Sequence, residues 1–308
     1  MPFLDHRDFQ VRYELDGPVG APCFVFVNGL TQYSELWEVY RKALVAKEFR
    51  VATFDLLGQG QSDKPALFVD QEDQVTILGM LIASLGKEPI FLSGISFGGV
   101  IALRYAIANN EKIAGLVAMS TFPELSPQLL LLGTAMRSGL VLGGTTYLQD
   151  LLLPMNVSDA WLGPVLDRLE AVKRQGWLTN DLYALQNLME SFLEFSPLTP
   201  KLGAIRVPTL ILNGEYDFLT PRRLHDILRV NIPDSKMVIM PRAFHAFTLE
   251  KPALTADLHA RFAVEVLAGT WHGGQSVMIA PDEPGGELIP FPAGYDHLRA
   301  IPTAPSAA

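Results

Sequence analysis

The sequence predicts an α/β fold in which a mostly parallel central sheet is flanked by helices and carries an inserted helical cap. Short apolar or β-branched runs alternate with helical patterns, which is the order of elements in a parallel sheet. The alternation is broken by residues 122–200, which carry only helical signals. At one strand-to-helix junction, Gly94, Ser96 and Gly98 form a G-x-S-x-G pattern.

The elements of the core are expected in two blocks. Expected strands are 10–15, 23–28, 50–55, 90–95, 113–119, 207–213 and 236–240, and expected helices are 35–46, 72–85, 97–108, one opened by Thr220 and Pro221, and 252–267. We therefore assign residues 1–121 and 201–269 to the core and residues 122–200 to the cap.

The cap contains one helix with a clear apolar face. Its apolar residues recur at helical spacing after a plausible N-cap at Thr179–Asn180: Leu182, Leu185, Met189, Phe192 and Leu193. This face either packs on the core or lines a pocket, and both can hold in part.

Residues 270–308 form a C-terminal extension. They are rich in Gly, Pro and small residues, so we do not expect a further domain there. The short runs 277–279 and 288–291 are apolar enough to dock on the surface of the core.

The composition limits the partners of this protein. The chain has 308 residues, of which 49% are hydrophobic, and a net charge of -9 without any basic run. Nucleic acids and anionic membrane surfaces both require clustered Lys and Arg, so we expect neither as a partner.

Targeting signals are not evident in the sequence. Residues 1–10 lack an apolar segment, and the leucine-rich run 129–142 is short and carries Arg137, so we expect no signal peptide and no membrane span. The single cysteine, Cys23, lies in an apolar run, which predicts a buried thiol and fits a cytoplasmic protein.

Ser96 is the candidate nucleophile. A strand that reverses sharply into a helix tolerates little bulk, hence Gly94 and Gly98 on either side of it. The serine hydroxyl is then held beside a helix N-terminus, where free N–H groups favour negative charge.

A serine nucleophile needs an imidazole to accept its proton and a carboxylate to orient that imidazole. Asp217 follows the 207–213 strand and is the candidate carboxylate, with Glu215 as a near competitor. Of the six histidines, only His245 lies in a loop between a late strand and the last helix, which completes the order Ser, Asp, His.

The oxyanion formed by serine attack requires backbone N–H donors. One candidate is Phe97, directly after the nucleophile. The other is Leu30, in the loop after the 23–28 strand, where Gly29 allows close approach of the backbone.

Together these residues resemble the α/β-hydrolase superfamily over about residues 22–267. The resemblance implies the α/β-hydrolase fold with a helical cap, the triad and oxyanion roles given above, and no metal or cofactor. The segment 54–65 is similar to a loop of many members. Members with an aspartate nucleophile, such as haloalkane dehalogenases and epoxide hydrolases, are disfavoured by Ser96.

One position departs from the common pattern of that superfamily. Most members carry His-Gly where this chain has Asn28–Gly29. A similar Asn-Gly occurs in the enzyme that joins 3-hydroxyacyl chains for rhamnolipid synthesis, which the chain also resembles around Phe54–Asp55 and Asp217. That likeness raises the alternative that a hydroxyacid, and not water, attacks the acyl-enzyme and releases the acyl group.

These observations predict a serine hydrolase that cleaves carboxylic esters. The leucine-rich cap predicts a small-molecule substrate with an apolar acyl or alkyl portion. Two alternatives stay open: an acyltransferase or thioesterase acting on acyl or hydroxyacyl thioesters, and a non-catalytic binding protein on the same fold. The cap leucines could instead face a second subunit, which leaves a homodimer open.

Overall fold

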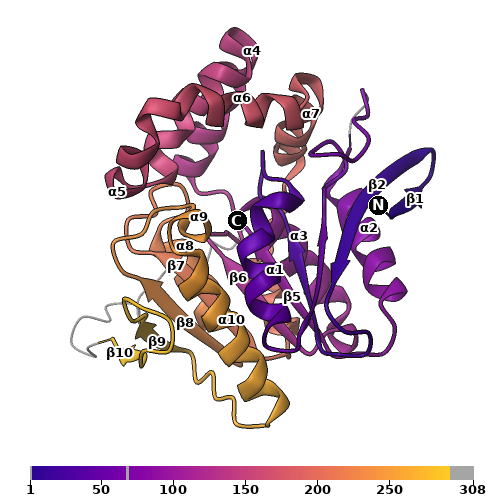
Figure 1. Ribbon diagram of the computed structural model, residues 1–308, viewed down its shortest axis with the longest axis vertical. Helices are drawn as coiled ribbons and strands as arrows, with labels where there is room; N and C mark the ends of the chain where they lie inside the picture. The colour runs from indigo at the N-terminus through magenta and orange to yellow at the C-terminus, as the bar shows by residue number, and fades with distance from the viewer. Residues whose placement is uncertain (1, 67–68, 292–308) are drawn as a thin grey trace.

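The computed structural model describes residues 2–66 and 69–291, and its centre is a ten-stranded sheet (Figure 1). The strand order is β1-β2-β4-β3-β5-β6-β7-β8-β9-β10. The strands are β1 (Phe3–His6), β2 (Phe9–Asp16), β3 (Cys23–Val27), β4 (Arg50–Phe54), β5 (Ile90–Ile95), β6 (Gly115–Met119), β7 (Thr209–Gly214), β8 (Ser235–Met240), β9 (Ser276–Ile279) and β10 (Ile289–Pro290). All pairs from β4 to β9 are parallel, and antiparallel pairing is confined to the two edges. The predicted mostly parallel sheet is confirmed.

Helices cover both faces of this sheet. On one face lie α1 (Glu38–Val45) and α10 (Pro252–Leu267), preceded by the short α9 (Phe247–Glu250). On the other face lie α2 (Gln71–Ser84), α3 (Phe97–Ala108) and α8 (Arg222–Asn231). Every residue of β3, β5, β6 and β7 is buried, as expected for strands covered on both sides.

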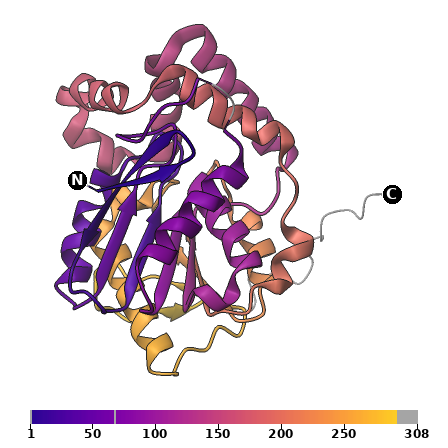
Figure 2. The ribbon, with the colours of Figure 1, turned by 90° about the vertical axis from the view of Figure 1, so that its right-hand side faces the viewer.

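The chain between β6 and β7 forms a cap of helices. They are α4 (Pro127–Asn156), α5 (Asp159–Leu162), α6 (Leu169–Thr179) and α7 (Leu182–Glu190). Figures 1 and 2 show them gathered over one end of the sheet. An apolar cluster joins α4 and α7 to a loop of the core: Leu140, Leu148, Leu152, Leu185, Met189 and Leu219. Part of the apolar face of α7 therefore packs within the cap.

Helix α4 is longer than the apolar run recognised in the sequence. It spans 30 residues and is interrupted at Gly144, which has φ 70° and ψ −168°. By length and composition alone it could cross a membrane, and only 11% of its most apolar window is buried. Its Leu140, Leu148 and Leu152 nevertheless pack against α7 and the core.

The C-terminal extension contributes to the sheet, which the sequence did not predict. Strand β9 pairs in parallel with β8, and β10 pairs with β9 in the antiparallel sense. The first part of the extension therefore continues the core, in place of docking on its surface. Residues 292–308 lie outside the described part of the chain.

Two further details differ from the sequence predictions. Residues 3–6 form β1, paired with β2 through a tight turn at Arg7, whose φ is 54°. The N-cap of α7 is Asp181, whose carboxylate accepts the N–H of Ala184 at 2.9 Å, and not Thr179–Asn180.

Candidate active site

Ser96 lies at the turn between β5 and α3, where its backbone is strained. Its φ of 52° and ψ of −118° fall where L-residues are uncommon. A Cβ on Gly94 would lie 2.4 Å from the carbonyl oxygen of Gly98, and one on Gly98 would lie 2.3 Å from that of Val27. The close packing of this turn therefore requires both glycines of the G-x-S-x-G pattern.

Two buried hydroxyl residues directly after β6 support the site. Thr121 Oγ1 donates to the carbonyl oxygen of Ser96 at 2.8 Å, and Ser120 Oγ donates to that of His245 at 2.8 Å. Both side chains are fully buried. Sequence reasoning missed them, although a Ser-Thr pair at the end of a buried strand is a signal that could have found them.

Asp217 and His245 are brought together from the ends of β7 and β8. His245 Nδ1 lies 3.0 Å from each carboxylate oxygen of Asp217, and both residues are buried. A proton on Nδ1 donates to this carboxylate, which leaves Nε2 as an acceptor. The competitor Glu215 is exposed and accepts the N–H of Arg242 instead, so Asp217 is the carboxylate that contacts His245.

Thr220 is a further residue of this cluster that the sequence did not reveal. Its N–H donates to Asp217 Oδ1 at 2.8 Å, and its hydroxyl donates to Oδ2 at 2.7 Å. The hydroxyl oxygen is also 3.3 Å from His245 Nδ1. Thr220 therefore fixes the carboxylate plane against the imidazole.

The surroundings of Asp217 keep its carboxylate charged. Burial is the largest single influence and raises the pKa of Asp217, but attraction to His245, its hydrogen bond, His225 and the Thr220 N–H together lower that pKa below its ordinary value. An ionised Asp217 can stabilise a positive charge on His245.

Two other histidines of the described chain, His225 and His259, are buried at places that do not line either cavity beside Ser96. His225 accepts the Thr121 N–H at 3.0 Å, and burial lowers its pKa to about 4. His259 is bonded to Ser93 and Thr255 on the opposite face of the sheet. Within residues 2–66 and 69–291, His245 is the histidine that lines a cavity together with Ser96.

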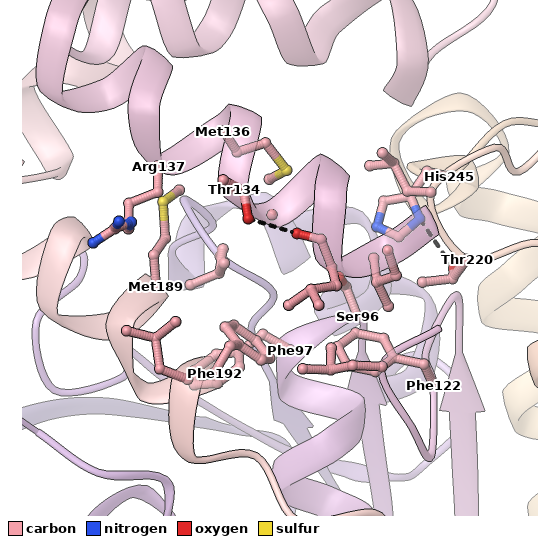
Figure 3. A pocket seen from close by; sticks show the side chains of 17 residues that line it. Ser96, Phe97, Phe122, Thr134, Met136, Arg137, Met189, Phe192, Thr220 and His245 are labelled. Atoms are coloured by element: carbon pink, nitrogen blue, oxygen red, sulfur yellow. Dashed lines mark hydrogen bonds between the residues drawn. The ribbon is translucent and has the colours of Figure 1, made fainter. Parts of the chain in front are cut away.

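An apolar cavity of about 130 Å³ opens beside Ser96 and His245. Figure 3 shows Phe97, Phe122 and Phe192 on one side of it and Met136 of α4 on the other. Hereafter this space is called the apolar cavity. Because core and cap both supply its walls, it exists only when the cap is in place.

A second cavity, of about 200 Å³, adjoins the first. The two share Leu30, Ser96, Met136, Leu219 and His245. The second cavity continues toward residues with polar groups, including Gln32, Gln149, Asn156 and Trp161. In the described residues no hydrogen bond joins Ser96 to His245, so the two side chains share these cavity walls without being bonded.

The two residues predicted to supply backbone donors both line the apolar cavity beside Ser96. Leu30 follows β3 and lines both cavities, and Phe97 is the first residue of α3. The first N–H groups of a helix have no partner within it. The N–H groups of Gly29 and Thr31 donate to Gln32 and Gln59, whereas that of Leu30 has no acceptor within the described residues.

Asn28, the position at which the resemblance led us to expect histidine, faces the core. Its side-chain N–H donates to the carbonyl oxygen of Phe54 at 2.9 Å, and its oxygen accepts from Trp37 Nε1 at 2.6 Å. The departure at this position therefore leaves the cavity walls unchanged. No group of three or more His, Cys, Asp or Glu suited to a metal occurs among the described residues.

Comparison with known proteins places this chain in a family. The profile of the family described as alpha/beta hydrolase fold matches residues 22–252. A protein of Azorhizobium caulinodans named as the carbamate hydrolase RutD is 25% identical over 86% of this chain and 99% of its own length. A 2-hydroxy-6-oxononadienedioate/2-hydroxy-6-oxononatrienedioate hydrolase of Cupriavidus pinatubonensis is 26% identical, over 79% of this chain and 88% of its own.

Solved structures agree with that assignment. MGS-M2, an alpha/beta hydrolase enzyme from a deep-sea metagenome library, superposes with a TM-score of 0.78 at 25% identity, covering 85% of this chain and 97% of its own. With three quarters of the chain matched by the family profile, the protein belongs to the alpha/beta hydrolase family.

Proposed function

We propose that this protein is a serine hydrolase that cleaves carboxylic esters through an acyl-enzyme. The observation that carries the proposal is the meeting of a strained Ser96 with the Asp217–His245 pair at one apolar cavity. The two relatives described above are named as hydrolases, which supports hydrolysis as the class of reaction.

In the proposed reaction, His245 Nε2 accepts the hydroxyl proton of Ser96 as Oγ attacks the ester carbonyl. The N–H groups of Leu30 and Phe97 donate to the oxyanion of the tetrahedral intermediate. When the intermediate collapses, the alcohol leaves with the proton from His245, and water then releases the acid by the same steps. The serine and histidine need to bond only once substrate is bound, because such contacts tighten in the complex.

The apolar portion of the ester fits the apolar cavity. Its volume of about 130 Å³ is close to that of an engineered cavity of roughly 150 Å³ that binds benzene. A linear chain of about four to six carbons is of similar size. Aromatic and aliphatic walls favour such a group, since each buried methylene contributes about 0.8 kcal/mol.

The second cavity supports a second candidate function. Its wall is mostly apolar but includes the polar side chains of Gln32, Gln149 and Asn156, and beside Ser96 it could receive an alcohol or a thiol acceptor or leaving group, as acyl transfer or thioester cleavage requires. The same serine, histidine and aspartate would serve all three reactions. A non-catalytic binding protein does not require a buried Asp217–His245 pair beside a serine, so we favour this function least.

A panel of aryl esters and acyl thioesters tests the proposal. We expect the protein to hydrolyse short- and medium-chain aryl esters. When an alcohol is added, the free acid should remain the product, and no new ester should form. Ser96→Ala is the blank and should lose at least about 10³-fold in kcat. Faster turnover of thioesters than of esters, or faster turnover of esters when an acceptor alcohol is added, would favour acyl transfer or thioester cleavage.

A further inference from the structure

One buried carboxamide spans the segment that carries the Leu30 N–H. Gln59 Nε2 donates to the carbonyl oxygen of Gly29 at 3.2 Å, and Gln59 Oε1 accepts the N–H of Thr31. Gln59 is fully buried, and its bond to Gly29 is shielded from water. Its two ends therefore bracket Leu30 and leave the N–H of that residue unoccupied.

Thr31 holds this segment in a conformation that a β-branched residue avoids. Its φ is 67°, in the left-handed region. Such a backbone persists only where its surroundings over-determine it. Here the N–H of Thr31 is bonded to Gln59, and its carbonyl oxygen accepts from Asn180 Nδ2 at 3.1 Å.

Asn180 belongs to the cap, between α6 and α7, and is 8% exposed. Its backbone forms an isolated antiparallel bridge with that of Gln59. Beside it, a Cβ on Gly58 would lie 3.3 Å from Leu188 of α7. The loop that carries Gln59 is thus packed between the cap and the Leu30 segment.

We propose that Gln59 and Asn180 are positioning residues that orient the Leu30 N–H toward the reacting carbonyl. Through Asn180, this orientation depends on the cap being packed on the core. This inference rests on the proposed function and deepens it. Without Gln59, the N–H of Thr31 loses its partner and the strained turn relaxes, which misplaces the donor at Leu30. Without Asn180, the same turn loses its link to the cap.

The chain offers a matched control for Gln59. Gln74 is also fully buried, and its carboxamide also bonds one backbone N–H and one carbonyl oxygen, both of Leu57, whereas it forms no hydrogen bond with the Leu30 segment within the described residues. We expect Gln59→Met to lower kcat on a butanoyl aryl ester roughly 10- to 100-fold with KM nearly unchanged, because only the transition state uses the donor. Gln74→Met should change kcat less than about threefold.

A trifluoromethyl ketone, which forms an oxyanion on the serine, gives a second readout. Its affinity should fall in Gln59→Met by about the same factor as kcat and stay unchanged in Gln74→Met. Gln59→Glu keeps an acceptor for the N–H of Thr31 but loses the donor to the carbonyl oxygen of Gly29. Its kcat and its affinity for the ketone should therefore also fall below those of wild type. Equal losses of kcat in Gln59→Met and Gln74→Met would overturn the inference.

The link to the cap is tested with Asn180→Ala and the control Asn187→Ala. Asn187 also joins the cap to the core, through the carbonyl oxygen of Pro65, but it lines neither of the two cavities beside Leu30. Hydrogen exchange of peptides covering residues 28–33 should accelerate in Asn180→Ala only, together with a loss in kcat. Unchanged exchange and kcat in Asn180→Ala would contradict the coupling.

The two levels of the proposal fail in different ways. If wild type hydrolyses no ester and no fluorophosphonate labels Ser96, the proposed function fails. If Ser96→Ala abolishes activity while Gln59→Met retains wild-type kcat and ketone affinity, the proposed function stands and the positioning roles of Gln59 and Asn180 are wrong.

Discussion

His245 has one ring nitrogen committed and one available. Asp217 and Thr220 surround Nδ1, so the nitrogen left to accept a proton is Nε2, on the side of the cavity that Ser96 lines. Because the pKa of Asp217 is held below its ordinary value by these partners, the carboxylate stays charged well into acid solution. In the proposed mechanism, a charged Asp217 would stabilise the positive charge that His245 gains from the serine proton.

At this scale we predict that Asp217→Asn lowers kcat by about 10²- to 10⁴-fold, since an amide favours the wrong tautomer of His245. Glu215→Gln is the matched control, because Glu215 carries the same charge two residues away and contacts Arg242 in place of His245. Steady-state kinetics on an aryl ester measure both. A larger loss from Glu215→Gln would show that the carboxylate assignment is wrong.

The sequence predicted candidate site residues that follow the ends of strands. It did not predict the residues that form hydrogen bonds to them or to the neighbouring backbone. Ser96, Asp217 and His245 each follow a recognisable strand, which is what made their meeting predictable. Thr220 donates to Asp217 three residues earlier, whereas Ser120 and Gln59 bond backbone groups that are distant in sequence. The hydrogen-bond partners of these three residues are identified only in the folded chain.

Among the elements, α4 and α7 supply part of the wall of the apolar cavity. The apolar face of α7 divides between two roles: Leu185 packs within the cap, whereas Met189 also lines the apolar cavity, as does Phe192 just after the helix. From the sequence, this face could either pack on the core or line a pocket. Helical periodicity shows which side of a helix is apolar, but it does not show what covers that side. The cavity wall of α4 includes Gly133, where an added side chain would meet open space.

We therefore predict that Gly133→Leu shifts the preferred ester toward shorter acyl chains. In wild type, kcat/KM should rise several-fold per carbon from acetyl to about butanoyl or hexanoyl and then level as the cavity fills. Gly163→Leu is the control, because Gly163 is also a cap residue with open space but lies outside the cavity wall. A chain-length profile that falls from acetyl onward in wild type would exclude an apolar acyl site.

For the whole molecule, the sheet joins segments that the sequence keeps far apart. The parallel core was predictable because each strand is followed by a helix with its own periodicity. The four residues of β9 carry no such signal, and they are a strand only because the edge of β8 lies open to them. Edge strands of this kind depend on the neighbour they find and not on their own composition.

Two histidines buried on opposite faces of this sheet make its stability depend on pH. Burial lowers the pKa of His225 and of His259 to about 4, against an ordinary value of 6.5. Between pH 6.5 and 4 the unfolded chain therefore binds protons that the folded chain does not, so stability falls as pH falls through this window. The slope is at most roughly 1.4 kcal/mol per pH unit for each histidine.

Urea unfolding at pH 7 and pH 5 measures this dependence. We expect a lower free energy of unfolding at pH 5, and a smaller difference between the two pH values in His259→Gln, which removes one of the two groups. His272→Gln is the control, because that histidine is exposed. An unchanged pH dependence in His259→Gln would mean that this histidine is not buried in its neutral form.

The most direct test of the proposed mechanism is the intact mass of the protein after reaction with an alkyl fluorophosphonate. If Ser96 is the nucleophile, wild type gains one phosphonyl group with loss of fluoride, peptide mapping places it on Ser96, and His245→Ala reacts far more slowly. Ser96→Ala should gain nothing. A label on another residue, or an equal gain in Ser96→Ala, would contradict a serine mechanism at this site.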